Sequence, residues 1–323
     1  MTFDRNDLDA ATAVVRRHVP PTPQYSWPML DQLAGSQVIV KHENHTPVGA
    51  FKVRGGLVYM DRLVIGRPHV AGVVSATRGN HGQSLAFAGR EYGRSVVVCV
   101  PHGNSVEKNA AMRALGAEVV EHGTDFQEAR ERSIEVAAER GLEPVPPFHP
   151  DLVLGVATYA LELFEGAGSL DTVYVPVGMG SGINALIAVR DLLGLDTQIV
   201  GVVAERAPST LLSFERGEVV TTGSASTFVD GVATRSPDPE AIDGICAGAA
   251  RIIAVSDDAT ADAMRIVYRS THNVAESAGA IALAGLLSEP VEQRGTRSAF
   301  VLCGGNVDTA QFHAVLGGAT PTG

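Results

Sequence analysis

Short runs rich in β-branched residues alternate with longer segments of helical periodicity, and this alternation constrains the fold more than any other feature. We expect strands at Val38–Lys41, Gly72–Ser75, Ser95–Val100, Glu118–Glu121, Thr172–Val177, Gln198–Val203, Ile252–Val255 and Ser298–Leu302. We expect helices at His81–Tyr92, Val106–Leu115, Asp125–Arg140, Gly182–Leu193, Asp258–Arg269 and Ala278–Leu287. Strands separated by helices favour a mostly parallel sheet with helices on both faces. The sequence therefore predicts an α/β fold.

A proline-rich segment at 143–150 is the clearest break in this alternation, and it separates two blocks of strands and helices. We interpret it as a crossover between lobes. With 323 residues, 45% of them hydrophobic, the chain can bury a sizeable core in one large α/β unit or in two smaller lobes. The glycine-containing end of the chain, 317–323, is expected to be frayed.

Composition excludes several classes of partner. The formal net charge is −11 and no cluster of Lys and Arg is present, so neither a nucleic acid nor an anionic membrane is expected as a partner. The N-terminus lacks a basic region followed by an apolar run, which favours a cytoplasmic protein. The three cysteines are Cys99, Cys246 and Cys303, and their spacing supports neither a disulfide framework nor a structural zinc site.

A single lysine stands among small and apolar residues in the segment 49–56, GAFKVRGG. If a helix begins near Phe51, Gly55 and Gly56 share the face of Lys52 and leave it open to a flat ligand. A lysine amine kept away from water has a lowered pKa and is neutral and nucleophilic, as covalent chemistry with an aldehyde requires. A surface lysine with a glycine pair that packs against another helix would give the same pattern. The segment alone leaves both interpretations open.

Two turns between a predicted strand and a predicted helix are suited to bind anions. In the turn 75–83, N–H groups and hydroxyls at the start of a helix favour a carboxylate, and Asn80 could bond to a ring substituent. In the turn 178–182, GMGSG, backbone amides and Ser181 could converge on a phosphate. Ile183 breaks the dinucleotide fingerprint, and the lysine of a P-loop is missing. Ordinary helix capping and helix–sheet packing remain the alternatives for these turns.

These segments, together with the glycine pair after Cys303, resemble those of the fold-type II pyridoxal-phosphate (PLP) enzymes, in the group of threonine and serine dehydratases and serine racemases. The resemblance runs from Pro20 to Asn306. It implies a tryptophan synthase β-like fold of two lobes, each a mostly parallel twisted sheet with helices on both faces. It also implies a large PLP-binding domain of residues 1–64 and 149–323 and a small, mobile substrate-loop domain of residues 65–148.

The resemblance assigns roles to individual residues. Lys52 corresponds to the lysine that holds PLP as a Schiff base, with Phe51 beside the ring, and Asn80 to the residue that bonds the PLP 3′-hydroxyl. Cys303 stands where the family offers Ser or Thr to the pyridine nitrogen, and Glu276 matches an acidic residue nearby. The implied phosphate-binding residues are Gly178, Met179, Gly180, Ser181 and Gly182. The implied substrate-binding residues are Ser75, Thr77, Arg78, Gly79, Asn80 and His81. The segment 230–235 resembles one that borders the active site.

The activity implied is α,β-elimination of water from a 3-hydroxy amino acid, with threonine or serine as first choice, giving a 2-oxo acid and ammonia. Lys52 would supply the amine that removes the α-proton, and a neutral contact from Cys303 would favour elimination over transamination. Alternatives are a dehydratase for phenylserine or 3-hydroxyaspartate, a serine racemase or a β-replacement enzyme. From a different class, the chain could be a catalytically silent homologue that binds a ligand.

Departures from the family pattern refine these expectations. Met179 and Ser181 interrupt the usual run of glycines in the phosphate loop. Arg78 occupies the position of the serine that serves racemases as an acid/base, and an arginine is a poor general base, so racemisation is disfavoured. Arg78 either meets a substrate carboxylate or points into solvent. Glu205 matches one ligand of a cation site, but the following residues lack a carboxylate, and we expect no metal. We expect no regulatory domain, and by analogy a homodimer or homotetramer.

Overall fold

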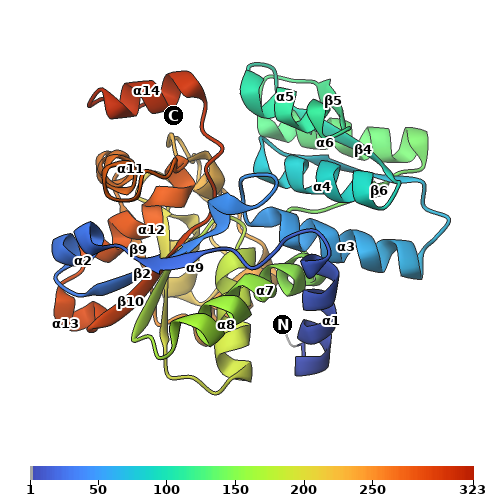
Figure 1. The fold of residues 1–323 in the computed structure, drawn as a ribbon. Coiled ribbons are helices and arrows are strands. Elements are labelled where there is room, and N and C mark those ends of the chain that lie inside the picture. Colours follow the sequence, from blue (N-terminus) through green and yellow to red (C-terminus); the bar gives the residue numbers. More distant parts are fainter. Residues whose placement is uncertain (1–2) are drawn as a thin grey trace.

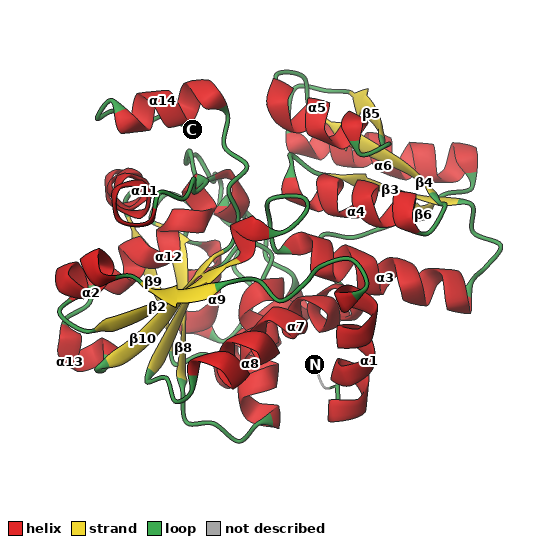
Figure 2. Cartoon of the chain, in the orientation of Figure 1, coloured by secondary structure: helices red, strands yellow, loops and turns green. Residues whose placement is uncertain are grey.

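The computed structural model describes residues 3–323 and contains two sheets (Figures 1 and 2). The larger, ordered β1-β2-β10-β7-β8-β9, consists of β1 (Gln24–Ser26), β2 (Gln37–His42), β7 (Thr172–Pro176), β8 (Gln198–Ala204), β9 (Arg251–Val255) and β10 (Arg297–Leu302). The smaller, ordered β5-β4-β3-β6, consists of β3 (Gly72–Ala76), β4 (Ser95–Val100), β5 (Glu118–Glu121) and β6 (Glu143–Pro144). Every pairing is parallel except that of β1 with β2.

The helices carry most of the remaining chain. They are α1 (Arg5–Arg16), α2 (Pro28–Ala34), α3 (Lys52–Gly66), α4 (Asn80–Glu91), α5 (Val106–Ala114), α6 (Phe126–Arg140), α7 (Pro150–Ala167), α8 (Ser181–Leu192), α9 (Ser209–Arg216), α10 (Pro239–Gly248), α11 (Asp257–Thr271), α12 (Ser277–Ser288), α13 (Val291–Arg294) and α14 (Thr309–Leu316). Two 3₁₀ helices, η1 (Glu43–His45) and η2 (Asp230–Val232), interrupt the loops.

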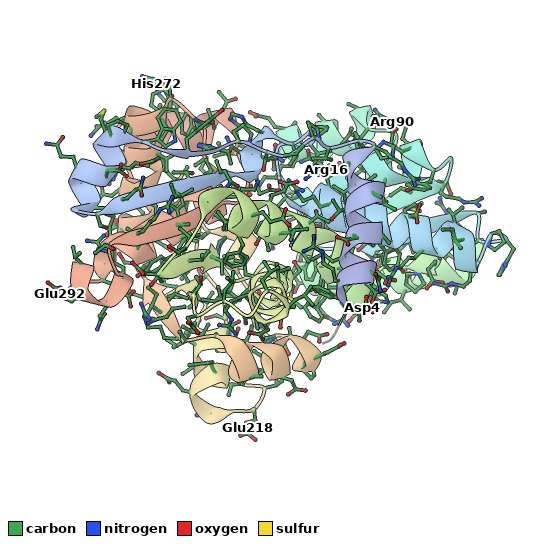
Figure 3. The ribbon with its side chains drawn as sticks, turned by 60° about the horizontal axis from the view of Figure 1, so that its bottom comes forward. Asp4, Arg16, Arg90, Glu218, His272 and Glu292 are labelled. Atoms are coloured by element: carbon green, nitrogen blue, oxygen red, sulfur yellow. The ribbon has the colours of Figure 1, made fainter. Side chains whose placement is uncertain are left out.

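Helices cover both faces of each sheet. In the larger sheet, α12 packs on one face and α7 and α8 lie on the other (Figure 1). In the smaller sheet, alternate residues of β3 enter different cores, because Val73 packs with α4 and Val74 with α6. Charged side chains such as Arg90 and Glu292 point outward (Figure 3). The predicted α/β fold is confirmed, and every expected strand is present.

Helix α3 lies between the two sheets, packed against α4 and α7 (Figure 1). Gly55 and Gly56 make this packing possible. A Cβ at Gly56 would lie 2.3 Å from Ser84 Oγ, and a Cβ at Gly55 would lie 2.7 Å from the Leu152 carbonyl oxygen. The interpretation of the glycine pair as an open ligand face is therefore wrong for Gly56, where α4 fills the space, whereas Gly55 packs on Leu152 and also lines a cavity beside Lys52.

A buried ionic network anchors the start of α3. The guanidinium of Arg54, which is fully buried, donates to both carboxylate oxygens of Glu43 at 2.8 and 2.9 Å. It also donates to Glu162 of α7 at 3.0 and 2.9 Å, and Lys41 of β2 donates to the same carboxylate at 2.7 Å. Two cations thus balance two carboxylates, and the network ties α3 to the larger sheet two residues after Lys52.

The segment 143–150 is a crossover, as expected, but it begins as a strand. Glu143 and Pro144 form β6 beside β3, and Pro150 then starts α7.

The end of the chain is not frayed, because the Arg265 guanidinium donates to the Val315 carbonyl at 2.8 Å and Ser226 Oγ donates to the Gly323 carbonyl at 3.3 Å. The smaller sheet falls within residues 72–144. The domain boundaries stay a prediction.

Among residues 3–323, no helix combines the length and apolar character that a membrane crossing requires. Within the same part of the chain, His, Cys, Asp and Glu side chains do not gather in groups of three that could hold a metal ion. Glu205, the one carboxylate matched to a cation site, is exposed directly after β8.

Candidate active site

Lys52 is the first residue of α3, and its position is fixed by the loop before it. The Phe51 N–H donates to the Cys303 carbonyl at 2.9 Å, and Ala50 forms an isolated bridge with Gly304, so the start of α3 is joined to the end of β10. Lys52 Nζ lies 4.8 Å from the centre of the Phe51 ring. Burial lowers the pKa of Lys52. Its amine is therefore neutral more readily than that of an ordinary lysine.

A small cavity connects Lys52 with the start of α8. It is lined by Lys52, Gly55, His81, Pro147, Leu152, Val156 and Ser181. His81 is buried, and its Nε2 atom has no hydrogen-bond partner within residues 3–323. Burial, with a smaller effect of the Lys52 charge, lowers the pKa of His81 to about 3. The cavity is thus lined by a neutral imidazole whose Nε2 atom has no partner among the described residues.

The glycine turn before α8 provides a tight anion cradle. Gly180 has a φ of 95°, which favours glycine, and it caps the helix that begins at Ser181. A Cβ at Gly178 would lie 2.3 Å from the Gly231 carbonyl oxygen, and a Cβ at Gly182 would lie 3.3 Å from Tyr159 Oη. The first N–H groups of α8 have no partner within the helix and attract an anion. Met179 is partly buried beside this turn.

Three side chains from distant segments meet at the other end of the site. Asn80 Nδ2 donates to Glu276 Oε1 at 2.6 Å, and Asn306 Nδ2 donates to Asn80 Oδ1 at 2.8 Å. Burial raises the pKa of Glu276, and it raises the pKa of the nearby Cys303 thiol well above its usual value. The Cys303 thiol is therefore neutral. Asn80 keeps one N–H on its amide nitrogen for a ligand.

The loop between β3 and α4 differs in part from the expectation. Ser75 lies within β3, and its hydroxyl donates to the Val145 carbonyl at 2.8 Å, so this hydroxyl is engaged in holding the crossover. Thr77 Oγ1 accepts a hydrogen bond from the Gly79 N–H at 3.3 Å. Arg78 is exposed, and no side chain of the described residues pairs with its guanidinium. His81 faces the cavity that it shares with Ser181.

Two contributors were missed by sequence reasoning. Asn306 lies in the glycine-containing turn after the last strand, where its position after Gly304 and Gly305 was a usable signal. Lys108 of α5 crosses directly over Gly79, because a Cβ on this glycine would lie 2.8 Å from Lys108 Cδ. Its ammonium lies 3.4 Å from Asp230 Oδ2. No local pattern marks Lys108, since its partners come from another lobe.

The site therefore combines a lysine buried away from water, a glycine cradle at the start of a helix and an Asn–Glu pair, all of which follow the carboxyl ends of strands. Residues 15–304 match the family described as pyridoxal-phosphate dependent enzyme. The chain belongs to this family. This chain is 34% identical over 299 residues to the biosynthetic L-threonine dehydratase IlvA of Salmonella typhimurium, and the match covers 91% of this chain. It spans only 57% of the length of that relative.

Two other similarities extend over nearly the whole length of both compared chains. The PLP-dependent enzyme is 30% identical to an L-threo-3-hydroxyaspartate ammonia-lyase from a Pseudomonas species, over 92% of this chain and 93% of the relative. The crystal structure of the T.th. threonine deaminase superposes with a TM-score of 0.89 at 29% identity, covering 95% of this chain and 99% of that chain. These matches confirm the fold-type II architecture and PLP as the cofactor of the family.

The residues present in the PLP-dependent enzyme fit PLP. Lys52 and His81, whose Nε2 has no partner within the described residues, line one cavity with Ser181, which stands next to Gly182 in the cradle. Lys52 would bind the aldehyde carbon, and the residues 178–182 would bind the phosphate. Asn80, Cys303 and Glu276 would contact the polar groups of the ring. These assignments to individual residues stay predictions.

Proposed function

We propose that the chain is an ammonia-lyase that eliminates water from a 3-hydroxy amino acid, with threonine or serine as the first candidates, and releases a 2-oxo acid and ammonia. The observation that carries this proposal is the joining of the Lys52 segment to the end of β10, where the Phe51 N–H donates to the carbonyl of the buried Cys303 at 2.9 Å and the thiol of Cys303 is neutral. A neutral thiol offers no anion to stabilise a protonated ring nitrogen, and this favours elimination over transamination.

PLP, when bound, supplies the electron sink for the bond that breaks at the substrate α-carbon. The protein has to orient the substrate and move the proton. Lys52 Nζ is the base for the α-proton, because burial keeps a fraction of its amine neutral. The N–H of Asn80, at the start of α4, would bind the substrate carboxylate, and the N–H of Gly79 would join it by exchanging its contact with Thr77 Oγ1 at 3.3 Å. Packing of Phe51 against Tyr159, with ring centres 6.1 Å apart, helps to exclude water.

Two substrate classes fit the comparisons. A neutral 3-hydroxy amino acid is supported by the Salmonella threonine dehydratase and by the T.th. threonine deaminase, both of which are named for threonine. An acidic substrate, 3-hydroxyaspartate, is supported by the Pseudomonas relative, whose length the chain covers almost completely. Arg78, exposed on the loop before α4, is a candidate contact for either substrate carboxylate.

A panel of substrates tests the proposal. The purified holoenzyme is supplied with threonine, serine, phenylserine and 3-hydroxyaspartate, and 2-oxo acid and ammonia are measured together. Equal amounts of both products from one substrate would support the lyase. If no substrate gives a 2-oxo acid, the proposal is wrong, and β-replacement, racemisation or ligand binding without turnover takes its place. A homodimer or homotetramer stays a prediction, which light scattering after size exclusion tests.

A further inference from the structure

An ion pair between the lobes lies beside the substrate loop, next to the segment that packs on the glycine turn. Lys108 belongs to α5 of the smaller sheet, and Asp230 begins η2 beside the larger sheet. Their side chains approach to 3.4 Å, with Lys108 only 12% exposed and Asp230 44% exposed. A mostly buried ammonium is unfavourable unless a carboxylate pairs with it, and Asp230 provides that carboxylate in this structure.

The position of Asp230 is set by the segments around it. A Cβ at Gly231 would lie 2.6 Å from Ala278 Cβ, and the Gly231 carbonyl oxygen packs against Gly178. The η2 turn is thus held between the glycine cradle and the start of α12. The backbone that bears Asp230 is thereby fixed relative to both elements.

Lys108 is held as closely. The Ser105 hydroxyl caps α5 by accepting from the Lys108 N–H at 3.0 Å, and it also bonds to Asp308. The preceding residue, Glu107, accepts from the Thr309 N–H at 3.0 Å. The first turn of α5 therefore contacts the larger lobe at three places. The Lys108 side chain lies directly over Gly79, whose N–H belongs to the proposed carboxylate site.

This geometry bears on the substrate's distal group. Because the Lys108 side chain crosses Gly79, a substrate whose α-carboxylate bound at this turn would lie beside Lys108 and its partner Asp230. While Lys108 is paired with Asp230, the substrate side chain meets an ion pair of zero net charge. A second substrate carboxylate would have to compete with Asp230 for the ammonium and would meet the negative charge of Asp230 itself.

We propose that Asp230 is a specificity-determining residue, which occupies the Lys108 ammonium and makes the site select neutral 3-hydroxy amino acids over acidic ones. The inference rests on the proposed function. Removing only the charge of Asp230 should free Lys108 to bind a distal carboxylate. Specificity then depends on a repulsive carboxylate as much as on any attractive contact.

Equilibrium binding tests this without turnover. Succinate and butyrate have the same number of carbons, and only succinate has a second carboxylate. In titration calorimetry of the holoenzyme, Asp230→Asn should bind succinate about tenfold more tightly than the wild type, with butyrate affinity unchanged. Combining Asp230→Asn with Lys108→Met should abolish the gain. Asp308→Asn, which removes a carboxylate that bonds to Ser105 and not to the Lys108 ammonium, should show no gain.

Kinetics gives the second measurement. The ratio of kcat/KM for 3-hydroxyaspartate to that for threonine should rise about tenfold in Asp230→Asn. Asp230→Ser, which also removes the carboxylate, should raise the same kcat/KM ratio. Unchanged succinate binding in both variants, or an equal gain in Asp308→Asn, overturns the inference. If the wild type turns over none of the hydroxy amino acids, the proposed function is wrong, while the succinate and butyrate comparison still decides whether Asp230 blocks Lys108.

Discussion

Asn80 and Glu276, which are 196 positions apart in the chain, are joined by a hydrogen bond of 2.6 Å from Nδ2 to Oε1. Asn80 begins α4 of the smaller sheet, and Glu276 precedes α12 of the larger sheet. The pair therefore joins the two lobes at the site. A Cβ at Gly304 would lie 2.4 Å from the same Glu276 oxygen, so the turn after β10 must be free of side chains for the pair to form.

Replacing Glu276 by Gln should change the pH dependence of stability. Burial raises the pKa of Glu276 above the unfolded value of 4.5, so its protonated form is favoured in the folded chain. Its contribution to folding is complete below the unfolded pKa and is lost as the pH rises through the folded pKa. Urea unfolding should therefore show that the stability of Glu276→Gln relative to wild type increases with pH in this range. A parallel change in the exposed Glu292→Gln would contradict this.

Replacing Lys52 by Ala should abolish turnover of the proposed substrate, by roughly a thousandfold or more, because it removes the base and the cofactor attachment. Borohydride reduction of the wild-type holoenzyme followed by peptide mass analysis should find the cofactor on Lys52. A reduced adduct on any other lysine would refute the assignment. Lys108→Ala is the matched control, since it also removes a largely buried lysine but should leave the Lys52 adduct intact.

His81 should make the protein sensitive to acid. Its pKa is lowered from 6.5 to about 3 by burial, so the unfolded chain binds a proton that the folded chain rejects. The contribution of neutral His81 to the free energy of unfolding is present above pH 6.5 and is lost as the pH falls below that value. Between about pH 6.5 and pH 5 the loss attributable to His81 is about 2 kcal/mol. His81→Gln should lack this part of the loss in urea unfolding, whereas the exposed His69→Gln should retain it.

The buried network around Arg54 should be costly to break. Arg54→Ala leaves the carboxylates of Glu43 and Glu162 without their main partner, and we expect a loss of about 3–5 kcal/mol in the free energy of unfolding. The exposed Arg62, on the same helix and paired with Asp151, should cost about 1 kcal/mol or less when changed to Ala. Chemical denaturation measures both. Similar losses for the two variants would contradict the energetic importance of the network.

The glycines of α3 provide a test of helix packing. Gly56→Ala would place a Cβ 2.3 Å from Ser84 Oγ and 2.9 Å from the Ser84 carbonyl oxygen, and we expect a destabilisation of about 1–3 kcal/mol. At Gly66, in the last position of the same helix, an added Cβ meets nothing within 4 Å. Gly66→Ala should stabilise by about 0.5–1 kcal/mol. Thermal unfolding compares the two, and a stabilising Gly56→Ala would rule out the close contact with α4.

The strands were predictable because a buried parallel strand is a short, continuous run of apolar residues, and this signal is local. Helix α7 was missed since it is buried on nearly all sides and therefore shows no polar face. Helix α1 was missed although Asp4 and Asp7 form a capping box that the sequence displays. A two-residue strand such as β6 gives no local signal at all.

By itself, the sequence determined the order of most strands and of several helices with a polar face between them, and the turns that bear Lys52, Asn80, Gly180 and Cys303, because chain-local periodicity and glycine placement fix these features. Only the tertiary structure decided that Gly55 and Gly56 serve helix packing, that Ser75 bonds to the crossover, and that Lys108 meets Asp230. Those outcomes depend on contacts between residues far apart in the chain. Such contacts are set by how whole helices and sheets pack, and no local pattern encodes them.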